Sequence, residues 1–270
     1  MNSEFIIREL RKSEIPKLKD FAPEDWHFEF DNFLRLHFDK DYFLAIVMVK
    51  GDEIIATANA IMSEKIGWAA NIIVAPSYQG KGLGYEITKH LIELMFNRVD
   101  SILLIATKMG EGLYKKFGFQ TIESYSFSEN KKIDLSTSKN IFPYEKKYLK
   151  DIIQLDFEAT AEKRINFLEA FLHKAWLYVS DEGLVDGFYI QGFGDGMIIA
   201  KSKKAGKTLL EFKHSQAAFR TVVPASNTVA LNHLKELGIE IKSKANRMVL
   251  GKDVYWQPQN IYSRIAGYCG

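Results

Sequence analysis

The feature that most constrains this chain is a glycine-rich turn between an apolar segment and an amphipathic one. Residues 71–84 read NIIVAPSYQGKGLG, with Gly80, Gly82 and Gly84 at alternate positions. The apolar start predicts a strand, and the spacing of apolar residues over 83–97 predicts a helix. Glycines let backbone N–H groups approach an anion closely, and the N-terminus of the helix adds a partial positive charge. The segment therefore predicts a pyrophosphate-binding loop between a strand and a helix.

Two common phosphate-binding patterns do not fit this loop. A dinucleotide-binding fingerprint needs a third glycine where this chain has Tyr85, and a P-loop needs Ser or Thr where it has Gly82. The loop instead resembles the acetyl-CoA signature of the GNAT superfamily of N-acetyltransferases. That signature reads Gln or Arg, two residues, Gly, one residue, then Gly or Ala, and a preceding strand that ends in Val-x-Pro strengthens the resemblance.

The resemblance implies that acetyl-CoA is the cosubstrate, and we expect no metal. The cofactor-binding loop residues would be Gln79, Gly80, Lys81, Gly82, Leu83 and Gly84. The strand residues that would pair through their backbone with the pantetheine arm are Ile72, Ile73 and Val74. The resemblance also implies that this strand is splayed from the strand at Ser101–Ala106 to make room for that arm.

Residues 113–119, LYKKFGF, resemble the second landmark of the superfamily, a helix that ends in Gly-Phe before a strand. In the superfamily, the tyrosine at the place of Tyr114 lies near the cofactor sulfur and is the usual candidate for the acid that protonates the leaving thiolate. A phenol with a pKa near 10 can protonate a thiolate whose conjugate acid has a pKa near 8.5 at moderate cost. The alternative is that Tyr114 is a half-buried packing residue. Thr107 stands where the superfamily often has Asn, and is a further candidate to bind the cofactor.

An acceptor amine must lose a proton before it attacks a thioester. For a lysine-like amine, the neutral form at pH 7 costs about 4.6 kcal/mol, so a base or a chain of waters is expected. GNAT proteins vary at this position, and the sequence leaves four candidate bases open: Glu53, His27, Glu29 and His37.

The substrate candidates come from residues 26–31, WHFEFD, which lie where GNAT proteins place the helices that cover the substrate. A mixture of aromatic and ionisable side chains suits a binding wall, and this predicts substrate contacts from Trp26, His27 and Asp31. The alternative is an amphipathic helix whose aromatic side chains belong to the core.

The second half of the chain repeats the second motif in altered form. Thr107, Tyr114, Gly118 and Phe119 each have a counterpart 120 residues later, in Asn227, Leu234, Gly238 and Ile239. Leu234 has no acidic proton, and residues 199–204, at the same offset from the cofactor loop, contain no glycine. The second half therefore predicts a GNAT-like domain without a cofactor loop or an acid.

The whole chain also resembles a group of two-domain bacterial acetyltransferases. Their C-terminal domain carries a Leu-Asp-x(7)-Arg pattern, followed later by Asn-x-x-Ala, Arg-Met and a closing Tyr. The matching residues are Leu155, Asp156, Arg164, Asn227, Ala230, Arg247, Met248 and Tyr262. For Asp156 and Arg164 we expect a structural ion pair rather than contact with a substrate.

A length of 270 residues suits two domains of ordinary size. We expect a catalytic GNAT domain at 1–130, a polar linker at 131–140 and a degenerate GNAT-like domain at 141–270 that completes the substrate site or forms a homodimer. The predicted fold class is α+β, a mixed α/β sandwich. It has a central, mostly antiparallel sheet splayed at the cofactor, followed by the second domain.

Charge and cysteine content narrow the partners. The net charge is +2, from 36 basic and 34 acidic residues, so no general attraction to nucleic acid or a membrane follows. No apolar run approaches the roughly 18 residues of a membrane span, the first ten residues have no apolar signal core, and the single Cys269 cannot form an internal disulfide. We therefore expect a cytoplasmic protein.

The leading interpretation is an enzyme that moves the acetyl group of acetyl-CoA to a primary amine of a small molecule or peptide. The alternative, from another class, is a regulatory module that binds acetyl-CoA without turning it over. A transferase of longer acyl chains stays open as well, because pocket depth cannot be read from the sequence.

Overall fold

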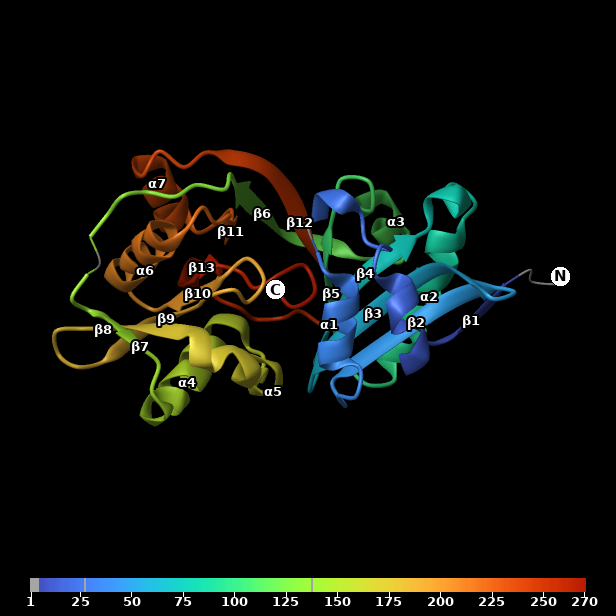
Figure 1. Ribbon diagram of the computed structural model, residues 1–270, viewed down its shortest axis with the longest axis horizontal. Helices are drawn as coiled ribbons and strands as arrows, with labels where there is room; N and C mark the ends of the chain where they lie inside the picture. Colours follow the sequence, from blue (N-terminus) through green and yellow to red (C-terminus); the bar gives the residue numbers. More distant parts are fainter. Residues whose placement is uncertain (1–4, 27, 137) are drawn as a thin grey trace.

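The computed structural model describes residues 5–26, 28–136 and 138–270. Its strands form an eight-stranded sheet and a five-stranded sheet, which lie side by side as the two halves of an elongated molecule (Figure 1). Strand β1 (Ile6–Glu9) lies at the far end of the first half, and the C-terminal segment lies between the halves (Figure 1).

The larger sheet is antiparallel throughout, except that β4 and β5 are parallel. This arrangement confirms the predicted α+β fold class with a mostly antiparallel sheet. Its strands, in spatial order, are β1 (Ile6–Glu9), β2 (Phe43–Lys50), β3 (Glu53–Ser63), β4 (Ile66–Val74), β5 (Ser101–Ala106), β12 (Ile241–Gly251), β6 (Gln120–Ser128) and β11 (Val222–Pro224).

The smaller sheet is antiparallel and belongs to the second half. Its strands, in spatial order, are β13 (Ile261–Ser263), β10 (Met197–Ala200), β9 (Val185–Ile190), β8 (Ala175–Val179) and β7 (Ile141–Pro143). The α-helices of the molecule are α1 (Phe30–His37), α2 (Leu83–Phe96), α3 (Glu111–Lys116), α4 (Leu149–Thr160), α5 (Ile165–Leu168), α6 (Lys203–Gln216) and α7 (Thr228–Glu236).

Strand β12 comes from the second half but lies between β5 and β6 in the first sheet (Figure 1). Its register with β5 runs from the pair Asn246 and Ala106 to the pair Gly251 and Ser101. The sequence analysis did not predict this strand, because its first half is polar and exposed and the segment shows no alternation of apolar and polar residues. The sheet that carries the glycine turn is therefore completed by residues from beyond the predicted linker.

The two faces of the first sheet are covered differently. On one face, α2 buries Ile87, Leu91 and Met95 against the strands. On the other face, Phe30 and Phe33 of α1 belong to a cluster of buried apolar residues that continues into the second half through residues such as Ile152 of α4. Because this apolar core extends through both halves, their relative placement is held by hydrophobic burial.

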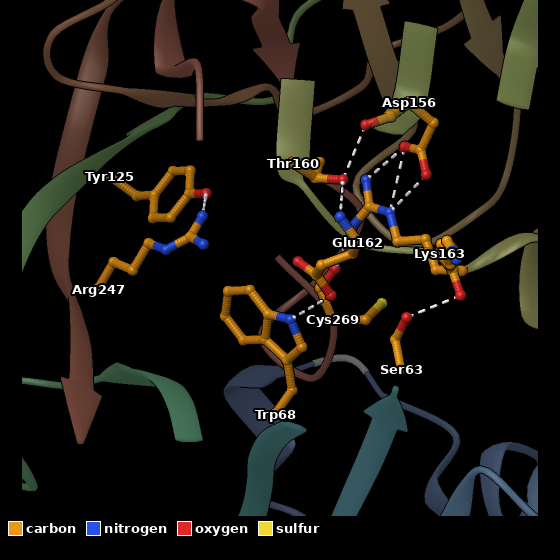
Figure 2. Close-up of polar contacts among 10 residues, drawn as sticks. Ser63, Trp68, Tyr125, Asp156, Thr160, Glu162, Lys163, Arg247 and Cys269 are labelled. Atoms are coloured by element: carbon orange, nitrogen blue, oxygen red, sulfur yellow. Dashed lines mark hydrogen bonds and ion pairs between the residues drawn. The ribbon is translucent and has the colours of Figure 1, made fainter. Parts of the chain in front are cut away.

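A buried polar network also joins the halves (Figure 2). The Nε and Nη2 atoms of Arg164 donate to both carboxylate oxygens of Asp156 over 2.7–3.1 Å, and its Nη1 donates to the carbonyl of Cys269 over 2.8 Å. Trp68 of β4 donates from Nε1 to Glu162 over 3.0 Å. Asp156 and Arg164 thus form the structural ion pair that the sequence predicted, and Arg164 also holds the C-terminal segment through the Cys269 carbonyl.

Candidate active site

Strands β4 and β5 part from one another in the middle of the sheet. They pair only from Ile66 with Ser101 to Trp68 with Leu103, and beyond these pairs their C-terminal ends diverge. A shift in the β3–β4 register lies at Asn71, whose φ of 47° is left-handed and whose Nδ2 donates to Asn59 Oδ1 over 2.7 Å. The predicted splay is therefore present, and it leaves backbone N–H and C=O groups of β4 free to pair with an extended ligand.

The glycine turn lies directly after the splayed end of β4. Gly80 and Gly82 have φ values of 76° and 80°, and a Cβ at either position would meet no heavy atom within 4 Å. Gln79 donates from Nε2 to the Val74 carbonyl over 3.0 Å and so ties the loop to the end of the strand. Gly82 is the N-cap of α2, whose first N–H groups have no acceptor within the helix. The open space above these glycines and the free N–H groups fit a diphosphate.

Lys81 differs from its neighbours in this loop. Its Nζ donates to the Ser77 carbonyl over 3.1 Å and lies 5.1 Å from the centre of the Tyr78 ring. The Lys81 side chain folds back on the loop, and it does not line the cleft into which the other predicted loop residues open.

That cleft has a volume of about 1250 Å³ and runs between the two halves. Its floor is the splayed region, with Ile72, Ile73 and Val74 on one side and Ile105 on the other. The second half supplies the opposite wall from the loop after β9 and from the segment after β13. One continuous space therefore connects the glycine turn with residues of both halves.

Tyr114 lines this cleft from α3. Its ring packs over Gly110, where an added Cβ would lie 2.9 Å from Cε2, and it meets the Phe119 ring edge-on at 5.9 Å. Burial raises the pKa of Tyr114 to about 12, so the phenol is protonated at neutral pH. Thr107 also lines the cleft, and its Oγ1 accepts a hydrogen bond from the Gly110 N–H over 3.3 Å, which fixes the start of α3.

The predicted substrate residues differ in whether they line the cleft. Trp26 lines the cleft and is 37% exposed. Asp31 lies outside the lining and faces Arg35 one helical turn away, at 3.8 Å. His27, a candidate for both substrate contact and base, lies outside the described residues.

Of the other candidate bases, His37 and Glu29 line the cleft. Glu53 does not, and it accepts a hydrogen bond from the Tyr78 hydroxyl over 2.7 Å. His37 is buried, and its Nδ1 lies 3.1 Å from the Tyr42 hydroxyl. Burial lowers the pKa of His37 to about 4, so its imidazole is neutral at pH 7 and keeps a lone pair.

Several cleft residues were missed by the sequence analysis. They are Asn71, Phe127, Asp195, Arg220, Arg264 and Tyr268. Asn71 begins the segment that contains the glycine turn, but the sequence assigned it no role. The other five residues lie after the second motif of the first half, in no recognisable local motif, and only the tertiary structure brings them to the cleft.

Neither a metal site nor a membrane span is found in the part of the chain that the structure describes. Within it, no group of three or more His, Cys, Asp or Glu side chains is placed to hold a metal ion. The helices of the same residues are all too short or too polar to cross a membrane.

The parted strands, the glycine turn and the helix that follows it together define an acyltransferase domain of the GNAT fold. The sequence agrees with this fold, because residues 7–119 match the model of the acetyltransferase (GNAT) family. This part of the chain is therefore a GNAT acetyltransferase domain. Acyl transfer with acetyl-CoA is the chemistry of that family. No curated protein matches the chain.

Solved structures resemble the molecule along its whole length. A proposed acetyltransferase from Pyrococcus horikoshii is 22% identical with a TM-score of 0.84, and the match covers 100% of this chain and 97% of that one. A GCN5-related N-acetyltransferase from Sphaerobacter thermophilus is 14% identical with a TM-score of 0.65, over 100% of both chains. One from Anabaena variabilis is 14% identical with a TM-score of 0.61, over 91% of this chain and 72% of that one. At these identities the likeness establishes the fold, including the two-part arrangement.

Proposed function

We propose that this protein is an N-acetyltransferase that moves the acetyl group of acetyl-CoA to a primary amine of a small molecule or peptide. The observation that carries the proposal is that the splayed strands, the glycine turn and Tyr114 open into one cleft. The cleft is large enough to bury most of a small ligand beside an extended cosubstrate arm.

Each part of the cleft has a task in this proposal. The N–H groups at the start of α2 bind the diphosphate, and the free edge of β4 aligns the pantetheine arm. Bound acetyl-CoA supplies the activated acetyl group. Tyr114 donates its phenolic proton to the departing thiolate. The amine proton leaves through water or through one of the two candidate bases that line the cleft, Glu29 and His37.

The second half has no equivalent site in this proposal. Leu234 of α7, at the place of Tyr114, is fully buried in the core that α7 shares with α6. The N-terminus of α6 is closed by Ser202, whose Oγ accepts from the Ala205 N–H over 3.2 Å. We therefore assign one acetyl-CoA site to each chain.

An amine panel tests the proposal. The full chain is incubated with acetyl-CoA and primary amines, and thiol release is followed together with the mass of the acetylated amine. We expect turnover with at least one amine, and calorimetry should give one acetyl-CoA site per chain. Binding of acetyl-CoA without turnover of any amine would instead indicate a regulatory module. Faster turnover with longer acyl-CoA donors would mean that the protein transfers a longer acyl group than acetyl.

A further inference from the structure

The wall of the cleft formed by the second half carries a cluster of charged side chains built around Asp195. Arg220 donates to Asp195 Oδ1 from Nε over 2.9 Å and from Nη2 over 2.5 Å. Arg264 donates from Nε to Oδ2 over 3.2 Å. All three residues line the cleft, and both the Asp195 and Arg264 side chains are at least nine-tenths buried.

Arg264 keeps unused hydrogen-bonding capacity in this cluster. Its Nη1 is buried without a partner among the described residues, although a buried guanidinium normally uses its donors. The guanidinium is held in place by the Tyr125 and Phe127 rings, whose centres lie 5.5 Å and 4.9 Å from Cζ. A buried, positioned guanidinium with a free end is the group that binds a carboxylate or phosphate in a fork geometry.

The groups around Arg264 carry an excess of positive charge, which also favours binding of an anion. One carboxylate, Asp195, faces two guanidinium groups. A third basic group, Lys213, donates from Nζ to the Asp195 carbonyl over 2.5 Å and to Ser263 Oγ over 3.1 Å. The pKa of Lys213 is lowered to about 7, mainly by burial and also by Arg220, while Asp195 opposes both effects. The net field of the cluster is positive and favours an anion.

The cluster lies at a distance from the splayed strands. Across the sheet, Ala106 at the end of β5 pairs with Asn246 of β12, which pairs with Ser124 of β6. Strand spacing and rise per residue put Phe127, beside Arg264, roughly 10–15 Å from Ala106. A single acceptor that reaches both places must therefore be extended, with its amine at one end and its anion at the other.

From these observations we infer that Arg264, with Arg220, forms an anion subsite that selects acceptor amines carrying a carboxylate or phosphate at the far end of the molecule. The inference rests on the proposed function and names its substrate class. Arg264 provides the free donors, and Asp195 orients the two guanidinium groups.

The test compares matched acceptors. The probes are ω-aminocarboxylic acids of graded chain length, the ω-amino amides of the same lengths and ω-aminoalkyl phosphates. In the wild type, we expect kcat/KM for the preferred anionic acceptor to exceed that for its amide by roughly 10- to 100-fold, the worth of a hydrogen bond to a charged group. The better of the carboxylate and phosphate series identifies the anion.

Variants assign the preference to particular residues. Arg264→Gln should remove the preference for the anion, so that the ratio of kcat/KM for the anionic acceptor to that for its amide falls to about 1. Unchanged acetyl-CoA affinity in calorimetry would show that the variant is folded, because the acetyl-CoA site lies at the glycine turn. Arg220→Gln, at a side chain that is 42% exposed, should weaken the preference without a risk to folding. Lys108→Gln is the matched control, because Lys108 lines the cleft in the segment after β5, on the side of the splayed strands and not at the Asp195 cluster.

Binding separates this inference from the proposed function. Calorimetry with the ω-aminocarboxylic acids and ω-aminoalkyl phosphates should show binding to the wild type and loss of binding in Arg264→Gln, whether or not turnover occurs. Turnover of amines with no preference for an anion, or an equal preference in Arg264→Gln, overturns the anion subsite and leaves the proposed function standing. Arg264-dependent binding without turnover of any amine supports the subsite and contradicts the proposed function.

Discussion

Burial sets the proton chemistry of the residues that face the splayed strands. It raises the pKa of Tyr114 to about 12 and lowers the pKa of His37 to about 4, so both groups are neutral at pH 7. The gap of about 3.5 units between Tyr114 and an ordinary thiol corresponds to roughly 5 kcal/mol. The same burial raises the pKa of a thiol bound beside Tyr114 and so narrows this gap. Proton donation by Tyr114 is therefore useful only as charge develops on the sulfur.

Tyr114→Phe tests this role, because it removes the hydroxyl and keeps the ring that packs on Gly110. We expect kcat to fall by roughly 10²–10⁴, the usual worth of a positioned proton donor, with little change in acetyl-CoA affinity. Tyr85→Phe is the matched control, since Tyr85 stacks on Phe117 at 4.5 Å and does not line the cleft. Wild-type turnover in Tyr114→Phe would make Tyr114 a packing residue and leave protonation to solvent.

At the scale of elements, the proposed acetyl-CoA site is built by three consecutive parts of the chain: β4, the glycine turn and α2. The strand is freed from β5 beyond Trp68, and the turn then reverses the chain through left-handed residues into the N-terminus of α2. A side chain at Gly82 meets no protein atom, so its effect would fall on whatever occupies the cleft. A side chain in the turn should therefore have two effects. Backbone strain lowers stability, as it would in any left-handed turn, and obstruction of the N–H groups lowers acetyl-CoA affinity, which is particular to this turn.

Gly82→Ala and Gly183→Ala separate these two costs. Gly183 has a φ of 81°, has equally open surroundings and lies in the turn between β8 and β9, outside the cleft lining. Both variants should lose about 1 kcal/mol of stability from left-handed strain. Only Gly82→Ala should weaken acetyl-CoA binding, by roughly 10- to 100-fold in calorimetry, because its Cβ obstructs the N–H groups. Equal affinities in the two variants would mean that the diphosphate binds elsewhere.

At the scale of the whole molecule, the two halves depend on one another. The second half supplies β12 to the first sheet and one wall to the cleft, and the C-terminal segment is held by Arg164 through the Cys269 carbonyl. Tyr268, next to that contact, stacks on Phe28 at 5.9 Å and lines the cleft. The buried network in Figure 2 therefore supports the cleft wall although none of its charged groups lines the cleft.

Arg164→Leu tests this support. Removing one partner of a buried ion pair leaves the other charge uncompensated, so unfolding in urea should show a loss of about 3–5 kcal/mol. Lys163→Leu is the adjacent control, because its pair with Glu64 is exposed and such pairs contribute little. The double variant Asp156→Leu with Arg164→Leu should recover most of the loss. Full stability of Arg164→Leu alone would contradict this account.

The sequence by itself determined the order of strand, glycine turn and helix around Gln79 to Gly84, because glycine positions and apolar periodicity act on the backbone within a few residues. The splay of β4 and the placement of Tyr114 were expected from the resemblance to the GNAT superfamily. The ion pair between Asp156 and Arg164 could also be predicted, since the two residues lie on either side of the C-terminal end of one helix.

Only the tertiary structure decided how the second half completes the first sheet and the cleft. Which strand enters between β5 and β6 depends on which edges remain unpaired after the local elements have formed, and no local pattern in the segment of β12 records that choice. The same holds for Arg264, Arg220 and Asp195, which lie on separate segments of the second half and meet through its own fold. The Arg264 N–H donates to the Val222 carbonyl and the Asp195 N–H to the Ile265 carbonyl, and these contacts join residues far apart in the sequence.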